Sequence, residues 1–133
     1  MKKLIAMLLA LVMILSLAAC GAKPAAEAPS AEPIKIGVLD AFTGDRASNG
    51  EYSKEGADLA MKHINEAGGV LGRQIELVYE DDQGNETVAT NAFQKIVSEH
   101  DLAAICLNKY SSVVLAMEQF VAEEGIPAIA CGS

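Results

Sequence analysis

The chain has 133 residues, of which 51% are apolar and 5% aromatic, and it contains no Trp. That length corresponds to one domain or less, and the apolar fraction is enough for a packed core. So few aromatic rings argue against a surface that stacks nucleic-acid bases. The formal net charge is −8, and a surface this acidic repels phosphate backbones, which excludes nucleic acid as a partner.

The first twenty residues have the organisation of a signal peptide. Lys2 and Lys3 form a short basic start, and the apolar run 4–17 that follows is too short to span a bilayer, which takes roughly 20 residues. The run ends in Leu17-Ala18-Ala19-Cys20, which resembles a bacterial lipobox with Cys20 as the lipidated residue. We expect export and a membrane anchor through lipid on Cys20. A plain signal peptide with an incidental Cys is the alternative.

Residues 21–33 are mostly Ala, Pro and Glu, and they contain no large apolar side chain. Such a segment cannot bury enough surface to fold, and its prolines keep it extended. We therefore expect a disordered tether between the lipid and a folded domain at 34–133.

From Ile34 onward, apolar strands alternate with amphipathic helices. The pattern predicts a strand at 34–39, a loop containing Thr43-Gly44 and Asn49-Gly50, and a helix over 53–67 that ends at Gly68-Gly69. The expected inward face of that helix consists of Gly56, Leu59, Ala60, Ile64 and Ala67. A second strand at 74–80 follows, and a second helix over 87–100 with Ala89, Ala92, Phe93, Ile96 and Val97 inward.

The remaining elements repeat this unit. A strand is expected at 102–107, a helix over 112–124 and a fourth strand at 126–130, with Gly125 ending the helix. The inward face of the helix consists of Val113, Val114, Met117, Phe120 and Val121. The order βαβαβαβ predicts an α/β fold with a doubly wound parallel sheet. Because no helix follows the last strand, we expect a truncated domain.

In open α/β sheets, ligands bind beyond the carboxyl ends of the strands. The loop after the third strand carries Tyr110-Ser111-Ser112 at the start of a helix. A helix N-terminus offers unpaired N–H groups to a carboxylate, and a Ser hydroxyl adds a donor. The alternative is that one Ser caps the helix, and both roles are compatible because two serines are present.

Other polar groups at this edge have simpler interpretations. Thr43-Gly44 is consistent with an ordinary turn, since no dinucleotide or phosphate-loop motif is present. The acidic run Glu80-Asp81-Asp82 is interpreted as a solvated turn rather than a Mg²⁺ or acid–base site.

No metal or enzyme site is expected. His63 and His100 lack Cys or carboxylate partners at metal-ligand spacing, and they are interpreted as surface or boundary residues. No nucleophile–base–acid set is visible, so neither catalysis nor a cofactor is predicted. Cys106 and Cys131 end strands that could be neighbours. Two buried free thiols are favoured, and a disulfide is the alternative.

Several short motifs in order carry a family resemblance. They are Ile34-Lys35-Ile36-Gly37-Val38, Phe42-Thr43-Gly44, Gly56-Ala57, the stretch from Ile64 to Gly72, Tyr79-Glu80-Asp81-Asp82 and Glu124-Gly125-Ile126-Pro127. Residues 34–133 thereby resemble the N-terminal lobe of the branched-chain amino-acid-binding (Leu/Ile/Val-binding-like) proteins of ABC importers.

The resemblance implies part of a type I periplasmic-binding-protein fold, whose two lobes close over a ligand. It implies that Ser111 and Ser112 receive the ligand carboxylate beside Tyr110, that Thr43 and Gly44 contribute from the first loop, and that Gly132 offers its carbonyl next to Ser133. Asn49 and Asn108 are also expected among the ligand-binding residues, although Asn49 stands where an aromatic residue is usual and Asn108 stands in a turn that is usually Gly-rich. Related small polar solutes are therefore considered beside branched-chain amino acids.

The function expected on this basis is that of an exported solute-binding lipoprotein, which hands an amino acid or related solute to ABC permease subunits. A ligand-sensing receptor domain of the same fold is one alternative, and a truncated non-functional remnant is another.

Overall fold

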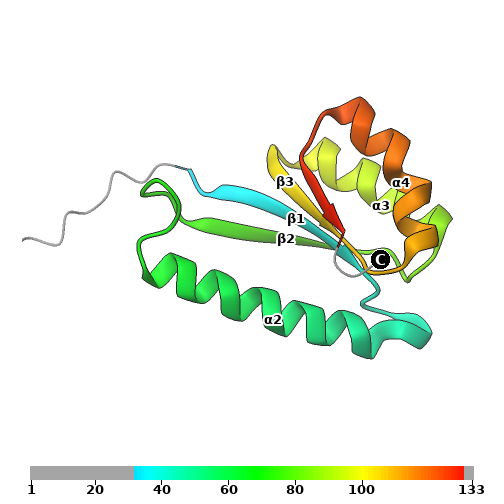
Figure 1. Cartoon of the computed structure of the whole chain (residues 1–133), viewed down its shortest axis with the longest axis horizontal. Coiled ribbons are helices and arrows are strands. Elements are labelled where there is room, and N and C mark those ends of the chain that lie inside the picture. The colour runs from blue at the N-terminus through cyan, green and yellow to red at the C-terminus, as the bar shows by residue number, and fades with distance from the viewer. Residues whose placement is uncertain (1–31, 131–133) are drawn as a thin grey trace, which may run out of the picture. The chain divides into compact units, whose positions relative to one another are not determined.

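Four parallel strands form one sheet in the order β2-β1-β3-β4 (Figure 1). The strands are β1 Ile34–Asp40, β2 Ile75–Asp81, β3 Leu102–Leu107 and β4 Ala128–Ala130. The computed structural model describes residues 32–130. The predicted signal peptide, Cys20 and nearly all of the predicted tether lie outside the described residues, as do Cys131, Gly132 and Ser133. The predicted α/β class with a parallel sheet is confirmed.

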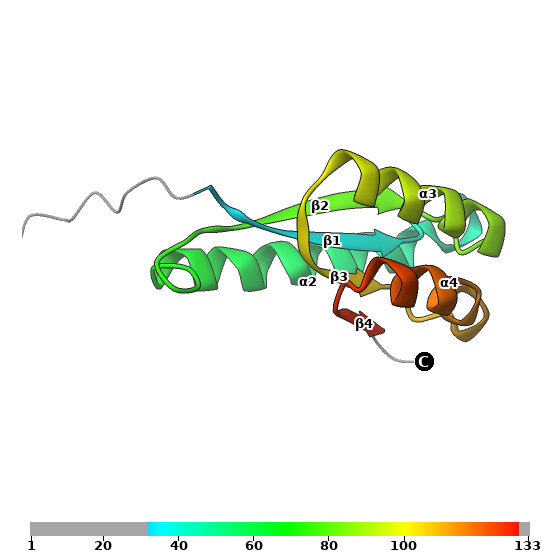
Figure 2. The ribbon, with the colours of Figure 1, turned by 90° about the horizontal axis from the view of Figure 1, so that it is seen from above.

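The helices cover both faces of this sheet, as a parallel sheet requires. A short 3₁₀ turn η2 (Gly44–Arg46) leads into α2 (Ala47–Glu66), and α3 (Glu86–Glu99) and α4 (Ser111–Glu124) follow β2 and β3. Figure 1 and Figure 2 show α2 on one face and α3 with α4 on the other. Among residues 32–130, no helix combines the length and the hydropathy of a membrane span.

The hydrophobic core lies between the sheet and the α3–α4 layer. Phe93 and Ile96 of α3, Met117 of α4 and Ile105 of β3 are almost completely buried there. The inward faces predicted for the second and third helices are thereby confirmed, and Val97, Val114, Phe120 and Val121 pack partly buried around them. Gly125 ends α4 as predicted, because it takes the left-handed conformation at φ 67°.

The prediction for the first helix is wrong in two respects. The helix begins at Ala47, so Asn49 and Gly50 lie in its first turns rather than in a loop. Gly50 is buried there, and a Cβ on it would stand only 2.0 Å from the carbonyl oxygen of Ala41. The glycine therefore permits a close approach between α2 and the end of β1.

The inward face of α2 also differs from the expected one. Gly56, Leu59, Ala60 and Ala67 are exposed, and only Ile64 is partly buried. Ser53, Ala57 and Met61 face the sheet instead, across an apolar cavity of about 350 Å³ that Cys106 also lines. Two of these three side chains are small, so the spacing of large apolar residues does not reveal the contact.

Candidate functional site

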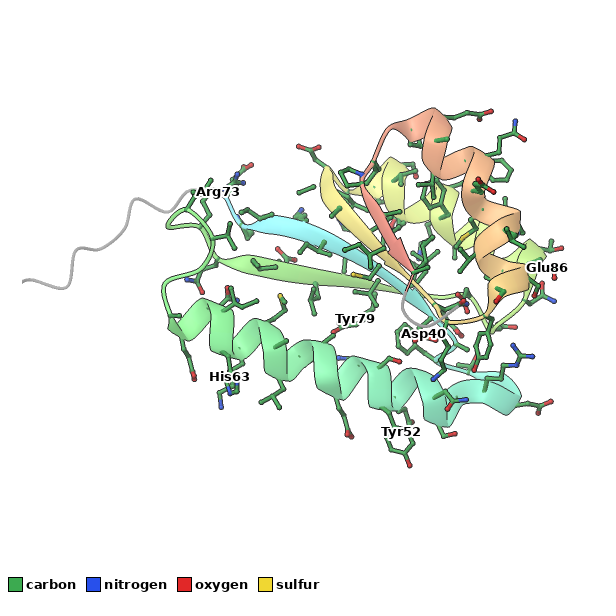
Figure 3. All side chains as sticks on the ribbon, viewed as in Figure 1. Asp40, Tyr52, His63, Arg73, Tyr79 and Glu86 are labelled. Atoms are coloured by element: carbon green, nitrogen blue, oxygen red, sulfur yellow. The ribbon has the colours of Figure 1, made fainter. Side chains whose placement is uncertain are left out.

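Three loops meet at one edge of the sheet, where β1, β2 and β3 end. The register pairs Asp40 at the end of β1 with Asp81 at the end of β2, and Val38 with Cys106 near the end of β3. In Figure 3, Asp40 and Glu86 mark this carboxyl edge, whereas Arg73 lies at the opposite end of the sheet. This is the edge at which an open parallel sheet binds its ligands.

Asp81 holds the loop that follows β1. Its Oδ1 accepts hydrogen bonds from the backbone N–H of Phe42 (2.8 Å), Thr43 (3.3 Å) and Gln83 (3.0 Å). Its Oδ2 accepts the Thr43 hydroxyl at 2.5 Å. Burial opposes ionisation of this carboxyl, but the hydrogen bonds from Thr43, Gln83 and Phe42 outweigh it and hold the pKa of Asp81 below its ordinary value.

This arrangement predicts how the loop responds to acid. A carboxyl whose pKa is lowered by folding stabilises the native loop above its unfolded pKa, about 3.9 for Asp, and loses that effect as the pH falls through the lower, folded value. We expect the amide resonances of Phe42 and Thr43 to titrate together below about pH 3.9 in an NMR pH series. In Asp81→Asn this step should be absent. A midpoint above that pH for both amides would contradict the assignment.

Asp82 is fully buried, with 0% of its surface exposed. Its Oδ1 accepts the backbone N–H of Gly84 at 2.8 Å, and its Oδ2 accepts a hydrogen bond from the side-chain amide of Asn108. Burial raises the pKa of Asp82, the bonds from Gly84 and Asn108 oppose that rise, and the nearby carboxylates of Asp40 and Asp81 add to it.

The interpretation of Glu80-Asp81-Asp82 as a solvated turn is therefore wrong. Only Glu80 fits it in part, since it pairs with the exposed Lys95 at 2.5 Å on the side of α3. Asp81 and Asp82 instead connect the loops of the carboxyl edge. Their role was missed because their partners are distant in sequence, although an Asn directly after a buried strand is a signal that a buried polar partner exists.

Asn108 and Tyr110 bring the third loop into the same cluster. Asn108 is 2% exposed, and its Oδ1 accepts the backbone N–H of Tyr110 at 2.9 Å. The Tyr110 hydroxyl accepts a hydrogen bond from Asn49 at 3.1 Å, and the Arg46 guanidinium stands 4.0 Å from the centre of its ring. Asn49 and Tyr110 were both predicted at the site, and they are hydrogen-bonded to each other. Asn108 is buried, and both the oxygen and the nitrogen of its side-chain amide are hydrogen-bonded.

Ser111 and Ser112 form the first turn of α4, and both are exposed. The residue at the cap position is Tyr110, whose side chain makes no capping bond, so the alternative in which a serine caps the helix is wrong. The first N–H bonded back along the helix is that of Val114, to the Tyr110 carbonyl at 3.0 Å. The N–H groups that precede it have no acceptor within the helix, and the exposed Ser111 and Ser112 lie in the same turn at the carboxyl edge, where the helix carries its partial positive charge.

The other predicted site residues are placed as follows. Thr43 is exposed beside Asp81, and Gly44 begins η2 with φ 79°. Gly132 and Ser133 lie outside the described residues. Arg46 was not predicted at the site. In the described part of this edge, it is the one arginine whose guanidinium stacks on an aromatic ring, that of Tyr110.

The residues considered for other chemistry lie elsewhere. His63 is exposed, His100 is half-buried, and no group of three metal-ligating side chains occurs among the described residues. Cys106 is half-buried and pairs in register with Ile129 of β4. Its relation to Cys131 stays a prediction, since Cys131 lies outside the described residues.

Comparison with known proteins gives one consistent result. The family described as periplasmic binding protein matches residues 33–133. The amino acid binding protein of Pseudomonas aeruginosa is 35% identical over 100 residues, which cover 75% of this chain and 27% of that protein.

Solved structures agree on the fold. The isoleucine complex of the branched-chain amino acid transporter substrate-binding protein LivJ from Streptococcus pneumoniae superposes with a TM-score of 0.70 at 30% identity, over 74% of this chain and 28% of that one. The fatty acid ABC transporter substrate-binding protein of Thermomonospora curvata superposes with a TM-score of 0.67 at 26% identity, over 77% of this chain and 26% of that one. The chain spans about a quarter of the length of the relatives it matches. Residues 32–130 correspond to part of the N-terminal lobe of the type I periplasmic-binding-protein fold.

Proposed function

The chain belongs to the periplasmic binding protein family, a family of solute-binding proteins rather than enzymes, and from that premise we propose that it captures a small carboxylate solute for an ABC importer. The site is the carboxyl edge, and the solute is an amino acid, of the branched-chain type or a related small polar one. ABC permease subunits receive it. The carrying observation is the first turn of α4, which presents two exposed serines at the edge where open sheets bind ligands.

The named ligands of the relatives support a carboxylate. The P. aeruginosa relative is an amino acid binding protein, the S. pneumoniae structure holds isoleucine, and the T. curvata protein serves fatty acids. These solutes share a carboxylate and little else. The N–H groups and hydroxyls of Ser111 and Ser112 match that common group, while Thr43, Gly44 and the Asn49–Tyr110 contact would face the rest of the ligand.

Ligand capture then follows from closure of two lobes. A solute that binds better to the closed than to the open arrangement shifts the protein towards closure. In this proposal, residues 34–133 supply the surface that holds the carboxylate, and Gly132 and Ser133 extend it. No bond of the solute is made or broken.

Ser111→Ala is expected to weaken ligand binding by roughly 1–3 kcal/mol, because the ligand carboxylate loses a donor at a site that closure of the lobes removes from water. Calorimetric titration of the full gene product with L-isoleucine and a panel of the other amino acids measures this effect. Ser98→Ala is the matched control, since Ser98 is an exposed serine in the last turn of α3, at the end of that helix away from the carboxyl edge. Equal affinities of wild type and Ser111→Ala would remove Ser111 from the site.

We further propose a division into three segments. Residues 1–20 are a lipoprotein signal peptide that ends at Cys20, residues 21–33 are a tether, and residues 34–133 are the ligand-binding lobe. The basic start, the short apolar run and the lipobox-like end support this division, and the family match begins at residue 33. The protein would then be exported and held at the outer face of the cell membrane.

Cys20→Ala is expected to abolish lipidation, because a thioether-linked lipid needs the thiol. In a bacterial host fed a clickable fatty acid, the wild-type protein should carry label and sediment with membranes, whereas Cys20→Ala should do neither. Cys106→Ala is the matched control and should keep the label. Labelled, membrane-bound Cys20→Ala protein would contradict the anchor.

A further inference from the structure

A buried pair of polar side chains, Asp82 and Asn108, connects the loop after β2 with the loop after β3. Their exposed fractions are 0% and 2%, and they lie in a region whose other fully buried side chains are mostly apolar. A carboxylate buried to this degree is retained only where its hydrogen bonds are complete, since removing it from water is costly. The partners of the pair therefore indicate what it holds in place.

The hydrogen bonds around the pair have donors and acceptors that are fixed from both ends, and they converge on Asp82. The backbone N–H groups of Gly84 (2.8 Å) and Tyr110 (2.9 Å) are fixed donors at the two ends. The Tyr110 donor requires the Asn108 oxygen, which leaves the Asn108 amide nitrogen to donate to Asp82. Asp82 accepts at both oxygens, which is the pattern of a carboxylate. Every bond of the series depends on an acid at 82 and an amide at 108.

The far end of this series is the start of α4. Tyr110 occupies the cap position, and Ser111 and Ser112 follow at once. The near end is fixed in the sheet, because the Asp82 N–H donates to the Asp40 carbonyl at 3.0 Å and the Asn85 N–H donates to the Asp82 carbonyl at 2.9 Å. The pair thus connects a rigid part of the sheet to the turn that carries the two serines.

We infer that Asp82 and Asn108 are positioning residues for the proposed ligand site, which fix through Tyr110 the place where α4 presents Ser111 and Ser112. This inference rests on the proposed function. Neither side chain touches the solute, since both are buried and hydrogen-bonded to protein. They act by holding the donors of α4 where a carboxylate needs them, and a misplacement of a fraction of an ångström lengthens those bonds.

Two single variants break the series without changing side-chain volume. In Asp82→Asn, amide nitrogens face each other, and flipping either amide moves the mismatch to the Gly84 or Tyr110 N–H. In Asn108→Asp, two carboxylate oxygens face each other. Each single variant should bind L-isoleucine at least about tenfold more weakly, the effect of one unmet buried polar group.

The double variant that carries both changes exchanges the two residues and restores every bond. The new amide at position 82 accepts from Gly84 through its oxygen and donates through its nitrogen to the new carboxylate at position 108, which in turn accepts from Tyr110. The net charge and the buried volume are unchanged. Its affinity for L-isoleucine should therefore return to within about twofold of the wild type, which independent damage at two positions would not produce.

The experiment is this four-member cycle in the full gene product. It measures L-isoleucine affinity by calorimetry, the melting temperature, and the Ser111 and Ser112 amide resonances by NMR. Weak single variants with shifted resonances and a restored double variant support the inference. Single variants that melt earlier yet keep the wild-type affinity and resonances would overturn it, as would a folded double variant that binds at least tenfold more weakly. If the single variants do not fold, the double variant alone decides. If wild type binds no amino acid while the resonances follow the cycle, the proposed function fails and the positioning of α4 stands.

Discussion

Gly50→Ala is expected to lower the free energy of unfolding by about 2–4 kcal/mol, an unusually large effect for one methyl group on a helix. A Cβ at Gly50 would stand 2.0 Å from the carbonyl oxygen and 2.6 Å from the carbonyl carbon of Ala41. Both atoms belong to the backbone of the residue that directly follows β1, whose last residue, Asp40, is paired with Asp81, so they cannot move aside as a flexible side chain would. Either α2 shifts away from the sheet or the strand end is distorted.

Gly56→Ala is the matched control, since Gly56 lies in the same helix and a Cβ added to it would meet nothing within 4 Å beyond its chain neighbours and the adjoining helix backbone. There the substitution should raise stability by about 0.5–1 kcal/mol, because Ala favours a helix over Gly. Urea unfolding followed by far-ultraviolet circular dichroism measures both, which suits a chain without Trp. Similar effects of the two substitutions would mean that α2 does not approach Ala41.

Phe93→Ala should cost about 3–5 kcal/mol, the range for emptying a buried aromatic position. Phe93 is 1% exposed at the centre of the core, where α3 faces the sheet and α4. The cavity would open in the cluster that also contains Ile105 and Met117, whose close packing leaves little room for collapse. In a protein of ordinary stability, this single change removes much of the margin that keeps residues 32–130 folded.

Leu59→Ala provides the comparison for Phe93. The sequence predicts both side chains to face inward, but Leu59 is 55% exposed on α2. Its truncation should change the free energy of unfolding by no more than about 0.5 kcal/mol. Thermal unfolding of the two variants under identical conditions compares the loss of stability at a buried position of α3 with that at an exposed position of α2. A large loss at Leu59 would mean that a further part of the protein covers this side of α2.

Local pattern was sufficient for most elements of this fold. The strands β1, β2 and β3 begin and end within one residue of their predicted bounds, and Phe93 and Met117 face inward as expected. In these segments the apolar period is set by burial against the sheet, so sequence and contact carry the same information. The order of the elements, with the chirality of parallel connections, then brings Thr43, Tyr110 and Ser111 to one edge.

The tertiary structure alone decided where α2 begins and how the edge is held together. Gly50 lies against Ala41, Ser53 and Ala57 face the sheet, and such small residues leave little apolar signal in the sequence. Asp81 reaches Phe42 across 39 positions and Asp82 reaches Asn108 across 26. An acidic run beside a turn has the same appearance in the sequence whether water or a distant loop completes its hydrogen bonds. The identity of the donors is settled only when the strands pair, because hydrogen bonding depends on separations in space that the order of residues does not record.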